Sequence, residues 1–184
     1  MKRAFIRSLF SLGCCLTLLL STSCSRPDPT ITLRGASQFD ENHAYSRTLK
    51  RFEELVRAYY GKPIKFEIYM NSELGLEKDY FAYMSQGLSV DFAVVSPSHM
   101  STFSRAAPLM DMPFLFRDID HWNLVLDSDA LDPIADEITA KADVHLIGFA
   151  GGGIRNLIVN KPVTTLAELN GLSIRVMGAP IQTR

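Results

Sequence analysis

The chain has 184 residues, of which 47% are hydrophobic and 21% are charged, and its formal net charge is −1. This composition is that of an ordinary globular protein and excludes a disordered or fibrous chain. The near-neutral charge disfavours nucleic acid as a partner, because nucleic-acid-binding domains usually carry a basic face.

The first 23 residues have the pattern of a secretory signal peptide. A basic start is followed by an apolar run that ends at Leu20, and three small residues then lead to Cys24. The apolar run is too short to span a membrane as a helix. Residues 20–24 resemble a bacterial lipobox, although Ser21 stands where leucine is usual. We therefore expect Cys24 to be lipidated; ordinary cleavage nearby, with release of a soluble protein, is the alternative.

Removal of this segment leaves a body without cysteine. Cys14, Cys15 and Cys24 are the three cysteines, so the body has neither disulfides nor thiol chemistry. Three of the 19 basic residues and none of the 20 acidic residues precede Cys24, which leaves 16 basic against 20 acidic residues, a balance of −4. An anion bound by this body must therefore be met by local cations.

After a short linker at residues 24–30, strand and helix patterns alternate. Period-two alternation predicts strands at residues 31–37 and 64–70, and an apolar run predicts a buried strand at 90–95. Apolar residues at helical spacing predict helices at residues 45–59 and 76–86. The order β-α-β-α-β is typical of a parallel sheet with helices on its faces, which predicts an α/β fold.

Ligands of such sheets bind at the carboxyl ends of the strands. The polar residues that follow the three predicted strands are therefore candidate ligand contacts, although each of them could equally make a turn. These residues are Ser37, Gln38, Asn71, Ser72 and Ser96.

The second half of the chain has a mixed pattern. Helices are predicted at residues 98–104, 118–126 and 131–141, and strands at 144–149, 154–159 and 172–176. Thr165 and Glu168 have the spacing of a helix capping box.

No pattern indicates catalysis or metal binding. Ser96 lacks the Gly-x-Ser-x-Gly turn of a hydrolase nucleophile, and the four histidines have no metal-ligand spacing. The triple glycine at residues 151–153 is not followed by the Gly-Lys-Ser/Thr of a phosphate loop. We therefore predict no catalytic residue, no metal and no cofactor.

Arg155 and Arg175 stand out because each lies within an apolar predicted strand. An arginine is costly to bury unless a carboxylate pairs with it, and its planar guanidinium suits bidentate hydrogen bonding to one carboxylate. That carboxylate could belong to a ligand or to the protein, and an outward-facing position on an edge strand is a further alternative.

Several segments, in order, resemble the substrate-binding proteins of tripartite ATP-independent periplasmic (TRAP) transporters of the dicarboxylate-binding type. The most specific are Gly-Ile-Arg at residues 153–155 and Leu-Asn-Gly-Leu-Ser-Ile-Arg-Val at 169–176. Weaker matches are Glu-Leu-Gly at residues 73–75, Asp-Phe-Ala at 91–93 and Met-Pro-Phe-Leu-Phe-Arg-Asp at 112–118.

The resemblance implies a periplasmic-binding-protein-like fold, in which two α/β domains close on a small organic acid and present it to a membrane permease. It implies a transport protein rather than an enzyme. Arg175 corresponds to the principal carboxylate-binding arginine and Arg155 to a second ligand-shell arginine. An acidic ligand-shell position falls on Asp79, with Glu77 close enough to leave the alignment open.

The implied domains are residues 31–150 and 151–184. Members of the family are longer than this chain, so we expect the second domain to be incomplete and residues 25–184 alone to be poorly stable and unable to bind. Rival hypotheses are a receptor for a sensor kinase, an exported lipoprotein hydrolase and a structural lipoprotein of the envelope.

Overall fold

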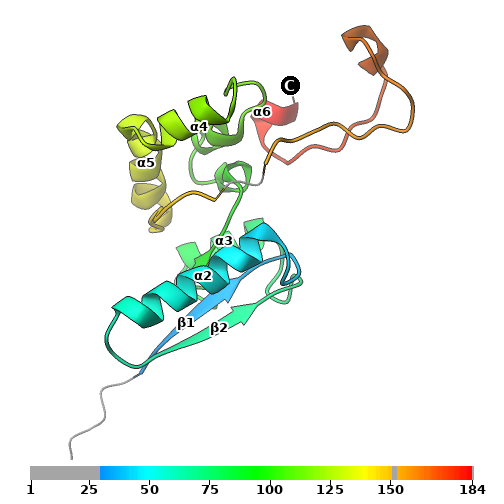
Figure 1. Cartoon of the computed structure of the whole chain (residues 1–184). Helices are drawn as coiled ribbons and strands as arrows, with labels where there is room; N and C mark the ends of the chain where they lie inside the picture. Colours follow the sequence, from blue (N-terminus) through cyan, green and yellow to red (C-terminus); the bar gives the residue numbers. More distant parts are fainter. Residues whose placement is uncertain (1–29, 151–152, 184) are drawn as a thin grey trace, which may run out of the picture. The chain divides into compact units, whose positions relative to one another are not determined.

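The computed structural model in Figure 1 describes residues 30–150 and 153–183. The chain divides into two units, Met1–Thr30 and Ile31–Arg184, and the fold described below belongs to the second. The predicted signal peptide, Cys24 and the linker up to residue 29 lie outside the described residues. No helix in the described ranges is long and apolar enough to cross a membrane.

A three-stranded parallel sheet forms the first part of the fold. Its strands are β1 (Ile31–Ala36), β2 (Ile64–Tyr69) and β3 (Phe92–Ala93), in the spatial order β2-β1-β3. Helices α2 (Ala44–Tyr59) and α3 (Glu77–Ser85) connect them, so the predicted β-α-β-α-β order is confirmed. β3 is shorter than the predicted strand, since only its two residues pair with the end of β1.

Aromatic side chains pack α2 against this sheet. The ring of Phe52 on α2 lies 6.3 Å from that of Phe66 on β2 and 5.0 Å from that of Phe92 on β3. Gly35 on β1 makes this possible, because a Cβ atom there would lie 2.6 Å from the Phe92 ring. The helix begins at His43, whose Nδ1 accepts a hydrogen bond of 3.2 Å from the backbone N–H of Tyr45.

Short helices follow β3. They are η1 (Pro97–Met100), η2 (Ala107–Asp111), α4 (Ile119–Leu126), η3 (Asp129–Leu131) and α5 (Asp132–Ala142). The predicted helices at residues 118–126 and 131–141 are confirmed, and Asp118 caps α4 by accepting from the N–H of His121 at 2.7 Å.

The predicted helix at residues 98–104 is reduced to a single 3₁₀ turn. The hydroxyl of Ser98 donates to Asp111 Oδ1 at 2.8 Å, and its backbone N–H donates to Asp111 Oδ2 at 3.3 Å. Side-chain and backbone bonds of this kind compete with helical hydrogen bonding.

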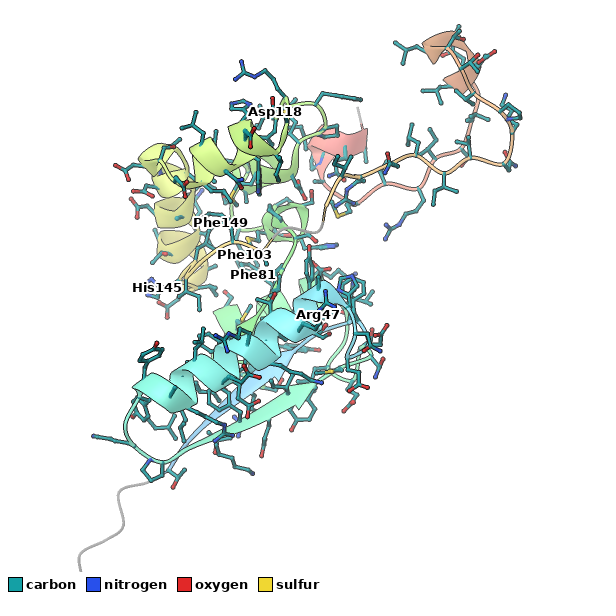
Figure 2. All side chains as sticks on the ribbon, in the orientation of Figure 1. Arg47, Phe81, Phe103, Asp118, His145 and Phe149 are labelled. Carbon is teal, nitrogen blue, oxygen red and sulfur yellow. The ribbon has the colours of Figure 1, made fainter. Side chains whose placement is uncertain are left out.

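Two apolar clusters meet at α3. Tyr80 belongs to a cluster with Ala36 and Val90 beside the sheet, whereas the next residue, Phe81, belongs to a cluster with the helical segments. Phe81 meets Phe103 edge to face, with ring centroids 5.2 Å apart, as Figure 2 shows. The second cluster is completed by Met100, Ala107, Met110, Ile138 and Ala142. One helix therefore supports both cores.

The predicted strands at residues 144–149, 154–159 and 172–176 are wrong for the structure as described. These segments are extended but join no ladder of the sheet formed by the described residues (Figure 1). A strand needs a neighbour for its backbone N–H and C=O groups, and alternation alone does not supply one.

The predicted capping box between these segments is confirmed. It begins η4 (Leu166–Leu169), where Glu168 Oε2 accepts from the backbone N–H groups of Thr164 and Thr165 at 2.6 and 2.9 Å. The short helix α6 (Pro180–Thr183) follows.

Candidate functional site

Residues from the ends of two neighbouring strands meet at one buried carboxylate. Gln38 follows β1, Ser96 follows β3, and Glu77 is the first residue of α3. Gln38 Nε2 donates to Glu77 Oε1 at 2.9 Å, and the backbone N–H of Ser96 donates to Glu77 Oε2 at 2.5 Å. Because β1 and β3 are parallel neighbours, their carboxyl ends lie at the same edge of the sheet, where α/β proteins bind ligands. We call Gln38, Glu77 and Ser96 the Glu77 cluster.

Glu77 is an unusual residue to bury. Its side chain is 2% exposed, and within residues 30–150 and 153–183 no lysine, arginine or histidine lies within 4.0 Å of it. Its two hydrogen-bond donors and the N-terminus of α3 are therefore its stabilising partners. A buried carboxylate at a strand-end edge, held without a cation, is typical of a functional site.

The charge of Glu77 also acts on Tyr80, one turn along α3. Burial raises the pKa of the Tyr80 hydroxyl well above its ordinary value, and the nearby Glu77 carboxylate raises it further. Tyr80 is therefore a neutral hydroxyl, which donates to the carbonyl of Val94 at 3.4 Å.

Ser37 faces α2 rather than the Glu77 cluster. Its side chain is 3% exposed, its Oγ lies 2.8 Å from Ser46 Oγ, and it accepts from the backbone N–H of Phe39 at 3.2 Å. Ser37 thus fixes the turn after β1 against α2.

The end of β2 supports the same turn. Asn71 and Ser72 have φ values of 51° and 62°, a left-handed conformation that costs non-glycine residues about 1 kcal/mol or more each. Asn71 N–H donates to the Phe39 carbonyl at 3.0 Å, and Ser72 Oγ donates to the Gln38 carbonyl at 3.2 Å. All three predicted strand ends therefore contribute to one edge of the sheet.

Asp79 lies on the first turn of α3 but outside the cluster. Its Oδ2 accepts from the backbone N–H of Leu76 at 2.9 Å, which caps the helix. Its neighbour Glu77 is the acidic residue that joins Gln38 and Ser96, and sequence reasoning did not select it. The signal was present in the ambiguity of the Glu77 and Asp79 alignment, but the sequence does not reveal which of the two acids turns inward.

Arg155 and Arg175 are exposed, in extended segments. The expectation that each is buried in an apolar strand is therefore wrong, and no desolvation penalty demands a partner. In the part of the chain that the structure describes, neither guanidinium forms an ion pair or a hydrogen bond with the Glu77 cluster. Nor do the described residues contain a group of three or more His, Cys, Asp or Glu residues able to hold a metal.

Residues 36–184 match the family model described as bacterial extracellular solute-binding protein, family 7. The chain belongs to this family. The sequence-based resemblance to TRAP solute-binding proteins is thereby confirmed, and the family is one of extracytoplasmic solute-binding proteins rather than of enzymes.

Individual relatives agree with this assignment. A solute-binding protein of Sulfitobacter sp. (strain NAS-14.1) is 52% identical over 152 residues, which are 83% of this chain and 46% of the relative. A solute-binding protein of Roseobacter denitrificans is 29% identical over 167 residues, 91% of this chain and 50% of the relative. The chain thus spans about half the length of the relatives that it matches.

Solved structures confirm the α/β binding-protein fold. A TRAP periplasmic solute-binding protein from Sulfitobacter sp. NAS-14.1, with bound α-D-taluronate, has a TM-score of 0.81 and 51% identity over 84% of this chain and 50% of its own. One from Citrobacter koseri, with bound D-glucuronate, has a TM-score of 0.71 and 27% identity over 82% of this chain and 50% of its own.

Proposed function

We propose that this protein captures a uronate, a sugar acid with one carboxylate and several hydroxyl groups, and delivers it to a TRAP-type membrane permease. The observation that carries this proposal is the structural similarity to a protein with bound α-D-taluronate, at 51% identity over 84% of this chain. The Glu77 cluster supports it, because amide, hydroxyl and backbone groups at a strand-end edge suit the hydroxyl groups of a sugar.

In this proposal the two arginines bind the uronate carboxylate. Arg175 makes the principal, bidentate pair and Arg155 assists it. Both are exposed, so a ligand can reach them. Closure of the two domains over the ligand then excludes water, which strengthens the ion pair.

The strand-end residues hold the remainder of the ligand. Gln38 and Ser96 face the sugar hydroxyls, while Ser37 and Asp79 maintain the backbone around them through the turn after β1 and the cap of α3. Outside the cytoplasm, a lipid on Cys24 would keep the receptor at the membrane that holds the permease; two acyl chains are needed for a stable anchor.

The test is a calorimetric titration of the complete protein encoded by the gene with D-taluronate, D-glucuronate, succinate and neutral D-glucose. We expect the uronates to bind and D-glucose not to bind. Arg175→Ala should weaken uronate binding by about 30-fold or more, because it leaves the ligand carboxylate without its main partner. Arg105→Ala, which removes another exposed arginine, is the matched control and should bind like the unmodified protein. Absence of uronate binding, or equal affinity after Arg175→Ala, overturns the proposal.

A further inference from the structure

We propose that Glu77 is a positioning residue that fixes the orientation of the Gln38 amide, so that this end of the site accepts a hydroxyl group and rejects a second carboxylate. The inference rests on the proposed function and specifies which sugar acids the site takes: uronates, with one carboxylate, rather than aldarates, with a carboxylate at both ends.

The first step is the polarity of the Gln38 amide. An ionised carboxylate only accepts hydrogen bonds, whereas an amide has a donating nitrogen and an accepting oxygen. The side chain of Gln38 lies 2.9 Å from Glu77 Oε1, so the nitrogen must face Glu77. The opposite orientation would place two acceptor oxygens against each other.

The second step is the position of the amide oxygen. Gln38 Oε1 accepts no hydrogen bond within the described part of the chain, where every fully buried side-chain nitrogen or oxygen does have a partner. This oxygen is therefore accessible from outside, as the half-buried state of Gln38 indicates. The main chain of Gln38 is held separately, since its carbonyl accepts from Ser72 Oγ at 3.2 Å. Glu77 thus sets the one remaining choice, the direction of the amide.

The third step is electrostatic. The outward end of the Gln38 amide carries partial negative charge, and behind it lies the buried Glu77 carboxylate, which has no cation within 4.0 Å in residues 30–150 and 153–183. Both repel an approaching carboxylate, and the repulsion is poorly screened because Glu77 is buried. A ligand hydroxyl can instead donate to Gln38 Oε1. The site therefore favours a neutral hydroxyl-bearing end.

The experiment compares two ligands that differ in this end, D-glucuronate and D-glucarate, by calorimetric titration of the complete protein. The unmodified protein should prefer D-glucuronate by about tenfold or more. Glu77→Gln removes the charge and lets the Gln38 amide turn over, so the preference should fall towards one. Glu73→Gln, an exposed carboxylate near the start of α3, is the matched control and should keep the full preference.

A second variant tests the same inference without changing Glu77. Gln38→Met removes the accepting oxygen, so it should weaken D-glucuronate binding about five- to tenfold and leave D-glucarate binding nearly unchanged. Thermal melting confirms that each variant is folded. Preservation of the ligand preference in a folded Glu77→Gln protein, or in Gln38→Met if the former does not fold, overturns the inference alone. A folded unmodified protein that binds neither acid overturns the proposed function and this inference with it, whereas equal binding of both acids overturns only the inference.

Discussion

Glu77 accepts a hydrogen bond of 2.9 Å from the side chain of Gln38, which lies 39 residues earlier in the chain. Its second oxygen accepts from the backbone of Ser96, 19 residues later. One carboxylate therefore ties together the end of β1, the start of α3 and the segment after β3. Three parts of the chain that are distant in sequence depend on a single side chain for their relative positions.

Replacement of Glu77 by alanine should destabilise the fold. The change leaves the N–H of Ser96, a residue that is itself buried, without its acceptor, which costs about 1–3 kcal/mol in the free energy of unfolding. Urea denaturation measures the loss. Glu73→Ala removes an exposed carboxylate of the same segment and should change the free energy by less than about 0.5 kcal/mol. Equal stability of the two variants would contradict the role given to Glu77.

Gly35→Ala should also destabilise the protein. The added methyl group would lie 2.6 Å from Cζ and 2.9 Å from Cε2 of Phe92, so the ring must move, at a cost of about 1–3 kcal/mol. Gly148→Ala is the matched control, because nothing lies within 4 Å of a Cβ atom there. In the double variant Gly35→Ala/Phe92→Leu, the loss measured by thermal unfolding should be smaller than the sum of the two single losses. Strict additivity would show that the two residues do not interfere.

The hydroxyl of Ser98 joins two segments that are 84 residues apart. It donates to Asp111 Oδ1 at 2.8 Å and accepts from Gln182 Nε2 at 3.1 Å, and Ser98 is 2% exposed. Ser98→Ala should cost about 1–3 kcal/mol, whereas Gln182→Ala should cost about 0.5–1.5 kcal/mol because it removes one bond. A double-mutant cycle by chemical denaturation should give a positive coupling energy; a coupling of zero would rule out the bond in solution.

The titration of Glu137 should depend on Lys141. A hydrogen bond from Lys141, followed by one from Ser104, holds the pKa of the Glu137 carboxyl below its ordinary value of 4.5. Because the folded-state pKa is lowered, this contribution to stability is complete above about pH 4.5 and is lost as the pH falls through the lowered pKa. Lys141→Gln should move the NMR-monitored pKa of Glu137 upward. An unchanged pKa would show that Lys141 is not the main cause.

Local signals in the sequence were sufficient for much of the first part of the fold. The alternation of strand and helix periods predicted β1, α2, β2 and α3, and the position of Asp118 agrees with the start of α4. The spacing of Thr165 and Glu168 predicted the cap of η4. These features depend on residues within one turn or one strand, so the sequence alone contains the information that they need.

Non-local contacts decided the remainder. Three segments with strand patterns join no ladder of the described sheet, because a strand exists only where another strand offers hydrogen bonds. Arg155 and Arg175 have the sequence context of buried residues but are exposed, since burial depends on what packs over them.

The sequence by itself determined the α/β order of the first elements, and its motifs identified the solute-binding family. Tertiary structure decided which acidic residue of α3 serves the site. Asp79 and Glu77 are two residues apart on one helical turn, and either could have faced the sheet edge. Asp79 turns back to cap Leu76, while Glu77 is held by donors from two strand ends. Those donors come from distant positions in the chain, and only folding brings them to the same carboxylate.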